Sequence, residues 1–279
     1  MTHPSLIRLG ISALALHLGT SLVQAQIFNL SDNNATASID VGSSAGMFNW
    51  TVQGQDQLFQ QWFWYRVGNS GPEAPINTIS PAVAVANTGT RGLSATYSQA
   101  QFSLRVEYLL TGGLLGGTKS TIGETITINN LSLSTLDFHF FQYSDFDLGG
   151  SAAGDSVIIG KNLLTGLYNT ANQIHPLVTF QESVHTPGAN HAEVGFFPNT
   201  LNKLNDLNTD TLSDITGLTG PGDVNWAFQW DLSIAPGASA IISKSKYVEL
   251  TAIPEPTSMT FLLSAAAFYA MLRSRRSAS

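Results

Sequence analysis

The 279-residue sequence contains no cysteine, and this absence removes several kinds of chemistry at once. Without thiols the chain has no disulfide, no cysteine nucleophile and no cysteine-ligated metal centre. Charged residues are also scarce, at 11% of the chain, and the net charge is −7. An acidic protein lacks the cations that neutralise phosphates, so the composition excludes a nucleic-acid partner. The fold has to be held by burial alone.

The first residues have the organisation of a secretory signal peptide. Arg8 supplies a positive charge, Leu9–Val23 form an apolar stretch, and Ala25 ends a pattern of small residues that signal peptidase accepts. We expect cleavage between Ala25 and Gln26. Residues 1–25 are therefore predicted to direct export through the Sec translocon and to be removed by signal peptidase.

The last residues combine a proline motif, an apolar run and a basic cluster, in that order: Pro254, Glu255 and Pro256, then Met259–Leu272, then Arg273, Arg275 and Arg276. The run Thr257–Leu272 would form about 24 Å of helix at about 1.5 Å per residue. That length falls short of the roughly 30 Å hydrocarbon core of a bilayer. Arginines are costly to insert, so the basic end is expected to stay in the cytoplasm.

This order of features, over residues 253–279, resembles the PEP-CTERM sorting domain. The resemblance implies that an exosortase recognises Pro254-Glu255-Pro256 and removes the tail. It also implies a cell-surface or extracellular location, with membrane contact only through a C-terminal transmembrane sorting helix before processing. By association with bacteria that make exopolysaccharide, it suggests extracellular polysaccharide as a partner. A permanent C-terminal membrane anchor is the alternative interpretation.

Residues 26–252 show the period-two alternation that is typical of half-buried strands. Phe102, Leu104, Val106 and Tyr108 alternate with polar residues, and Val224–Leu232 places large apolar residues at every even position. Short strands separated by glycine, proline and asparagine turns predict an all-β fold. We expect a single antiparallel β-sandwich, Ig-like or jelly-roll-like, in one domain. One stretch, Thr200–Ile215, has a weak helical period.

A glycine-rich turn carries the strongest candidate for a metal site. Asp145, Asp147 and Asp155 surround Gly149, Gly150 and Gly154. Carboxylates on such a turn can converge on Ca²⁺, which takes six to eight oxygen ligands. The spacing does not fit an EF-hand, because its twelfth position is Ser156 and not Glu. A solvated acidic turn is the alternative; otherwise we expect no cofactor.

Three further groups offer weaker candidates. Asp206–Asp210, with Asp214 beyond, begins like a calcium loop but also fits an Asx-rich turn. His185, His191 and Glu193 flank a proline–glycine loop and would suit zinc or simply a polar surface. The aromatic run Trp62–Tyr65 would stack on sugars or pack in the core. Catalytic motifs of the Gly-x-Ser-x-Gly or His-Glu-x-x-His type are absent.

With no catalytic motif, the sequence favours a non-catalytic protein. We expect an exported structural or binding component of the cell surface or matrix, associated with exopolysaccharide. Two alternatives differ in class. One is a secreted carbohydrate-active enzyme, whose paired carboxylates would converge in a cleft. The other is a calcium-stabilised adhesion module.

Overall fold

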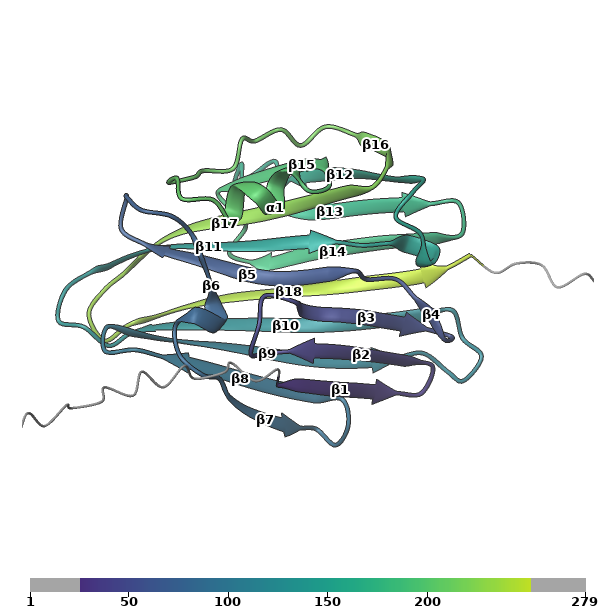
Figure 1. Cartoon of the computed structure of the whole chain (residues 1–279), viewed down its shortest axis with the longest axis horizontal. Coiled ribbons are helices and arrows are strands. Elements are labelled where there is room, and N and C mark those ends of the chain that lie inside the picture. Colours follow the sequence, from purple (N-terminus) through teal and green to yellow (C-terminus); the bar gives the residue numbers. More distant parts are fainter. Residues whose placement is uncertain (1–25, 252–279) are drawn as a thin grey trace, which may run out of the picture.

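The computed structural model describes residues 26–251, which fold into two stacked β-sheets (Figure 1). The first sheet contains nine strands, and they are β1 (Ile27–Asp32), β2 (Ala35–Asp40), β3 (Gly46–Val52), β4 (Gln55–Asp56), β5 (Gln60–Val67), β6 (Ala74–Pro75), β11 (Leu136–Asp145), β15 (His191–Phe196) and β17 (Val224–Ile234). The second sheet also contains nine strands, and they are β7 (Val83–Asn87), β8 (Gly92–Ser98), β9 (Phe102–Gly112), β10 (Lys119–Asn130), β12 (Asp155–Lys161), β13 (Tyr168–His175), β14 (Val178–Thr186), β16 (Thr219–Gly222) and β18 (Ser239–Leu250).

The strand order confirms the expected all-β class with antiparallel sheets. The first sheet runs β1-β2-β3-β5-β11-β17-β15, with β4 on β3 and β6 on β5, and the second runs β16-β12-β13-β14-β18-β10-β9-β8-β7. Every pairing is antiparallel except that of β3 with β5. An Ig domain has about seven to nine strands in total. The likeness to Ig-like or jelly-roll-like domains is therefore one of layered architecture and does not extend to strand number.

Alternation places one face of each sheet in the core. On β17, Trp226, Phe228 and Trp230 are all fully buried and face the second sheet. Burying an aromatic side chain removes about 150–250 Å² from water, worth roughly 4–6 kcal/mol at about 25 cal/mol per Å² as an upper bound. Phe146, just after β11, reaches across to Phe180 of β14 with ring centroids 4.0 Å apart. The aromatic core therefore ties the two sheets together.

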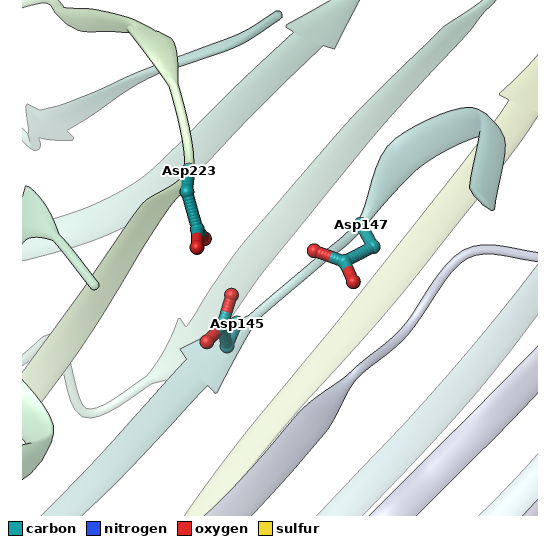
Figure 2. Close-up of side chains that lie close together, drawn as sticks. All are labelled: Asp145, Asp147 and Asp223. Carbon is teal, nitrogen blue, oxygen red and sulfur yellow. The ribbon is translucent and has the colours of Figure 1, made fainter. Parts of the chain in front are cut away.

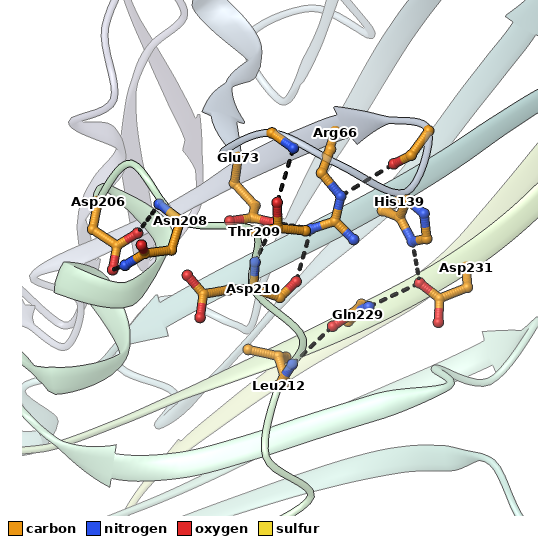
Figure 3. Close-up of polar contacts among 12 residues, drawn as sticks. Arg66, Glu73, His139, Asp206, Asn208, Thr209, Asp210, Leu212, Gln229 and Asp231 are labelled. Carbon is orange, nitrogen blue, oxygen red and sulfur yellow. Dashed lines mark hydrogen bonds and ion pairs between the residues drawn. The ribbon is translucent and has the colours of Figure 1, made fainter.

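The outer face of the first sheet is covered by residues 197–218, which we call the strap. Three buried contacts fasten it, as Figure 3 shows. Arg66 donates from Nη1 to the Asp210 carbonyl at 2.8 Å, and Glu73, its ion-pair partner, accepts the Asp210 amide at 3.2 Å through Oε1. Gln229 Oε1 accepts from the Leu212 amide at 2.9 Å. The polar positions that β5 and β17 turn outward are thus used to hold a covering segment.

The helix of the strap is shorter than the sequence predicted. α1 spans only Asn199–Leu204, and two short 3₁₀ turns, η1 (Ile76–Thr78) and η2 (Leu148–Gly150), are the other helical pieces in the described part of the chain. Helical structure ends here because Asp206 Oδ1 accepts the Asn208 amide at 2.6 Å, an Asx turn that competes with helix. The Asp206 group is therefore occupied by turn formation.

The predicted signal peptide and sorting tail lie outside the described residues. This applies to Ala25 at the expected cleavage site, to Pro254, Glu255 and Pro256, and to the basic residues Arg273, Arg275 and Arg276. Within residues 26–251, none of the helices has the length and apolar character needed to cross a bilayer.

Candidate functional site: an acidic cleft at one end of the sandwich

Three aspartates converge where strands β11 and β17 meet the end of the sandwich (Figure 2). Asp145 is the last residue of β11, Asp147 follows in the loop, and Asp223 directly precedes β17. One carboxylate oxygen from each lies within 4.8 Å of the other two. The antiparallel pairing of β11 with β17 causes this meeting, because it brings the end of one strand beside the start of the other.

Asp145 occupies the buried floor of this triad. It is 1% exposed, and its Oδ2 accepts a hydrogen bond from the Tyr143 hydroxyl at 3.0 Å. Its Oδ1 has no hydrogen-bond partner among the described residues. Asn225, the cross-strand partner of Asp145, is also fully buried, and its amide atoms likewise have none. Buried polar atoms without partners are costly, so a water molecule, a cation or a ligand group that paired with these atoms would be stabilised here.

The loop after β11 places the side chain of Asp147. Phe146 is buried, which anchors the chain just before the turn. The chain then reverses through η2, where Gly149 has a φ of 73° that disfavours any residue with a Cβ. Gln57 Oε1 accepts the Gly149 amide at 2.8 Å and fastens the turn to the first sheet. Asp147 is left half-buried beside Asp145.

A tight approach of two chain segments places Asp223. Gly220 packs so closely on β12 that a Cβ there would lie 2.3 Å from the Asp155 carbonyl oxygen. Only glycine allows β16 to pair with β12 at this distance. The chain then enters β17 with Asp223 directed at the other two carboxylates (Figure 2). The Gly-Pro-Gly-Asp sequence is therefore part of the construction of the site.

Asp155, which the sequence grouped with Asp145 and Asp147, is near the triad but not in it. Its Oδ2 accepts the Leu148 amide at 3.1 Å and the Gln173 side-chain amide at 2.8 Å. These bonds make Asp155 a clamp for the loop that carries Asp147. Asp223 takes its place as the third member of the cluster that could bind a metal.

The electrostatics of this end of the protein favour protonated carboxyls. Burial, and then the charges of Asp223, Asp147 and Asp155, raise the pKa of Asp145 to about 7, against the opposing hydrogen bond from Tyr143. Burial likewise raises the pKa of Asp155 to about 6. The pKa values of Asp147 and Asp223 are raised too, again by burial. Burial, with mutual repulsion of the carboxylates as the smaller cause, is the reason that Asp145 holds a proton near neutrality.

In the part of the chain that the structure describes, no basic side chain relieves this repulsion. Among residues 26–251, no lysine, arginine or histidine forms an ion pair with Asp145, Asp147, Asp155 or Asp223. A cluster of this kind has two chemical uses: it shares protons as an acid–base pair, or it coordinates a cation.

Two adjoining hollows open above the triad and share Phe59 and Asp147. One has a volume of about 520 Å³ and is bordered by Phe48 and Asp56. The other, of about 230 Å³, is lined by Asp145, Asp223 and Phe197. We call the two together the acidic cleft. Phe59 and Phe197 are 55% and 40% exposed. Exposed aromatic faces beside carboxylates are the groups that bind sugar rings, by stacking and by hydrogen bonding to hydroxyls.

The weaker sequence candidates do not form sites. Trp62, Phe63 and Trp64 are fully buried, so this run is unavailable for stacking on a ligand. His185 contacts Ser245 on the second sheet, whereas His191 contacts Asp214 of the strap and Glu193 binds Lys203. The histidines therefore serve separate structural contacts. Asp214 anchors the strap through His191 and the Ala192 amide.

No protein-family model and no curated protein sequence matches this chain. Solved structures do share its fold. A putative aldose 1-epimerase from Escherichia coli K12 superposes with a TM-score of 0.55 at 12% identity, covering 82% of this chain and 100% of that one. A galactose mutarotase-like protein from Lactobacillus casei gives 0.53 at 9% identity, covering 81% and 100%. A bacterial glucoamylase bound to acarbose gives 0.56 at 8% identity, covering 87% of this chain and 35% of its own length.

These comparisons correct the expected function. The sequence led us to expect a non-catalytic matrix component, in other words not an enzyme, and that expectation was wrong: the chain shares its fold with a putative aldose 1-epimerase, with a galactose mutarotase-like protein and with part of a glucoamylase. The expectation was wrong because it was based on the absence of catalytic sequence motifs. Acid–base chemistry on sugars needs only two placed carboxyls, which leave no contiguous motif in the sequence. The similarity concerns the fold alone, and function depends on the side chains that line the cleft.

Proposed function

We propose that the protein is a carbohydrate-active enzyme that performs acid–base chemistry at the anomeric carbon of a sugar bound in the acidic cleft. The observation that carries this proposal is Asp145. It is a buried carboxyl with its pKa raised to about 7, next to Asp147 and Asp223 and below exposed aromatic rings. A pKa near the working pH is the property that a general acid requires.

The roles follow from burial. Asp145, on the floor, holds a proton at neutral pH and donates it to the ring or glycosidic oxygen of the sugar. Asp147 and Asp223 are half-buried, and the more exposed carboxylate of the two accepts a proton from a hydroxyl or stabilises the developing positive charge. The oxygens of the triad lie within 4.8 Å. That spacing is nearer to the roughly 5 Å of retaining glycosidases than to the roughly 6.5–9.5 Å of inverting ones.

The charge of the cleft narrows the substrate class. Carboxylates line it, so uronic acids and sulfated sugars would be repelled. Neutral sugars, whose apolar faces stack on Phe59 and Phe197, suit it better. The fold shared with an epimerase and with a glucoamylase supports sugars as the substrate class.

The test is an activity screen of residues 26–251 against neutral oligosaccharides and free aldoses. Release of reducing ends reports hydrolysis, and polarimetry of a freshly dissolved aldose reports epimerisation. Asp145→Asn should reduce the observed activity by at least 10²-fold, the usual contribution of a general acid. Asp137→Asn is the matched control, because Asp137 lies on the same strand at the far end and is solvent-exposed. No activity on any neutral sugar, or full activity in Asp145→Asn, would overturn the proposal.

A second candidate use of the triad is Ca²⁺ binding. The observation in its favour is the buried Oδ1 of Asp145, which has no hydrogen-bond partner and belongs to a cluster of acidic ligands. Asp147 and Asp223 would supply further oxygens, and the cleft leaves room for water ligands. The two uses exclude each other at Asp145, since a cation requires it ionised and a general acid requires it protonated. Titration calorimetry with CaCl₂ decides between them: no heat of binding would eliminate the calcium site.

For location, we propose that the enzyme acts after export, at the cell surface or outside the cell, where exopolysaccharide is the glycan it would meet. The support is the sequence of the two ends, including the Pro254-Glu255-Pro256 motif. Cell fractionation of wild-type and exosortase-deficient strains, followed by intact mass, tests it. Recovery of the full chain from the cytosol with both ends present would contradict it.

A further inference from the structure

A second cluster of ionisable residues lies between the two sheets and lines neither hollow of the cleft. Lys244 and Lys246 of β18 alternate inward with Glu124 of β10 and Glu182 of β14, its neighbours on either side. The side chains of all of them are 0% exposed. Opposite lie the Phe63 ring of β5, 5.0 Å from Lys244 Nζ, and Gln142 of β11, which donates to Glu182 at 2.9 Å.

Lys246 lies close to two carboxylates of this cluster but forms a hydrogen bond with neither of them. Lys246 Nζ lies 2.6 Å from Glu124 Oε2 and 3.5 Å from Glu182 Oε2. Neither contact has the geometry of a hydrogen bond, and Glu124 Oε1 and Glu182 Oε1 also lack partners. Lys244, by contrast, does donate to Glu124. A buried ion pair is stable only when its remaining donors and acceptors are satisfied. Lys246 and Glu124 do not meet that condition.

We propose that Lys246 and Glu124 condense after folding into an intramolecular isopeptide bond between β18 and β10. A bond forms between Lys246 Nζ and the Glu124 carboxyl carbon, and a carbon–oxygen bond of that carboxyl breaks. The ammonium and the carboxylate together lose one oxygen and two protons, which leave as one molecule of water. No oxidant and no further reactant is needed.

The neighbours supply what the condensation requires. Burial lowers the pKa of Lys246 to about 8, although Glu124 and Glu182 oppose the shift, so the free amine is accessible. Burial acts to raise the pKa of Glu124, but the two ammonium groups prevail and lower it. A proton must therefore pass from Lys246 to Glu124 first. Glu182, within 3.5 Å of Lys246, is placed to relay it, and Lys244 is placed to stabilise the oxyanion of the tetrahedral intermediate.

The isopeptide bond would leave the charges of the core balanced. One positive and one negative charge disappear together, and Lys244 keeps Glu182 as a partner at 3.4 Å. Converting two buried charges into an amide removes their desolvation penalty. The bond would also cross-link central strands of the second sheet in a chain that has no cysteine and hence no disulfide.

Intact-mass spectrometry of purified residues 26–251 tests this directly. We expect a mass one water molecule below that of the sequence, and a branched tryptic peptide that joins the segment containing Glu124 to the one containing Lys246. The Lys246→Met variant should have the full mass calculated from its own sequence, with no loss of water. Lys119→Met is the control, since Lys119 lies on β10 but its side chain is 57% exposed, and it should keep the loss.

Glu182→Gln probes the proton relay and should slow or abolish the loss of water while Gln142 can still contact residue 182. A wild-type protein at its full sequence mass would overturn the proposal, and so would a branched peptide formed by other residues. If Lys246→Met does not fold, the wild-type mass and its peptide map still decide the question.

Discussion

Phe59 and Phe197 meet edge to face, with ring centroids 6.1 Å apart, although they come from segments on opposite sides of the β11–β17 pair. Phe59 directly precedes β5, and Phe197 directly follows β15. Both rings line the hollow that contains Asp145 and Asp223. Two partly exposed rings over a buried acidic group form the part of the cleft that a sugar would contact first.

Replacing either ring should therefore weaken substrate binding more than folding. We expect Phe59→Ala and Phe197→Ala to raise KM by severalfold to tenfold, because an aromatic contact contributes about 0.5–1.5 kcal/mol beyond area burial. Their thermal midpoints should stay close to that of the wild type, since both side chains are largely exposed already. Val85→Ala, another exposed apolar position, serves as the control. Unchanged KM in both variants would place the sugar elsewhere.

The pH dependence should follow Asp145. If its protonated form is the acid, the rate will fall as the pH rises through about 7 and will be restored on acidification. The stability of the fold should change with pH in the same direction as the rate. The folded pKa lies above the unfolded value, so the folded state binds more protons, and this contribution is full below about 4 and is lost as the pH rises through about 7.

Thermal melts at pH 5 to 8 measure this contribution. Asp145→Asn should flatten the decline with pH, because the amide does not titrate and needs no proton to be neutral. A midpoint that falls from pH 5 to 8 by the same amount in both proteins would contradict the assignment.

Calcium should leave a clear mark if the triad coordinates it. At a concentration about 100-fold above Kd, a ligand of the folded state adds about 2.7 kcal/mol, which for a domain of this size is on the order of 5–10 °C in thermal midpoint. Asp223→Asn should lose this shift, whereas Asp206→Asn, in the exposed Asx turn, should keep it. An identical midpoint with EDTA and with Ca²⁺ argues for the acid–base role.

The Arg66–Glu73 pair should matter for stability and not for the cleft. Both side chains are at most 5% exposed, and removal of one partner leaves a buried charge alone. We expect Glu73→Gln to cost about 3–5 kcal/mol in urea unfolding. The double change Arg66→Met with Glu73→Leu should recover much of the loss. Equal stability of the wild type and Glu73→Gln would show that water reaches this pair.

The strands were readable from the sequence because burial on one face imposes a local pattern. The alternation in β9 and β17 predicted both strands correctly. Asp145 and Asp147 were singled out because they are neighbours in the chain. Asp223 was missed as a ligand because its proximity depends on the pairing of β11 with β17, and that register leaves no trace in either segment alone.

The aromatic residues show the same limit. The sequence left the run Trp62–Tyr65 open between sugar stacking and core packing, and Trp62 and Trp64 are core; Phe59 and Phe197, which no sequence pattern marked, are partly exposed. Trp64 Nε1 donates to Asn205 of the strap at 3.1 Å, and Trp62 Nε1 donates to Asn77 of η1 at 3.1 Å. Phe59 lies directly before β5 and Phe197 directly after β15, and both rings stay partly exposed there. Whether a ring is buried therefore depends on a distant segment.

The end of β18 has a consequence for how the enzyme would be oriented. Leu250 pairs with Val178 at the start of β14, and β14 contacts η2, the turn that follows Asp147 (Figure 1). The chain thus leaves the sandwich on the side of the acidic cleft. If the residues that follow formed a permanent anchor, which is the alternative to removal by an exosortase, the acidic cleft would be turned toward the surface that holds the protein. Such an enzyme would remodel the coat in which it sits and leave free oligosaccharides in the medium largely untouched.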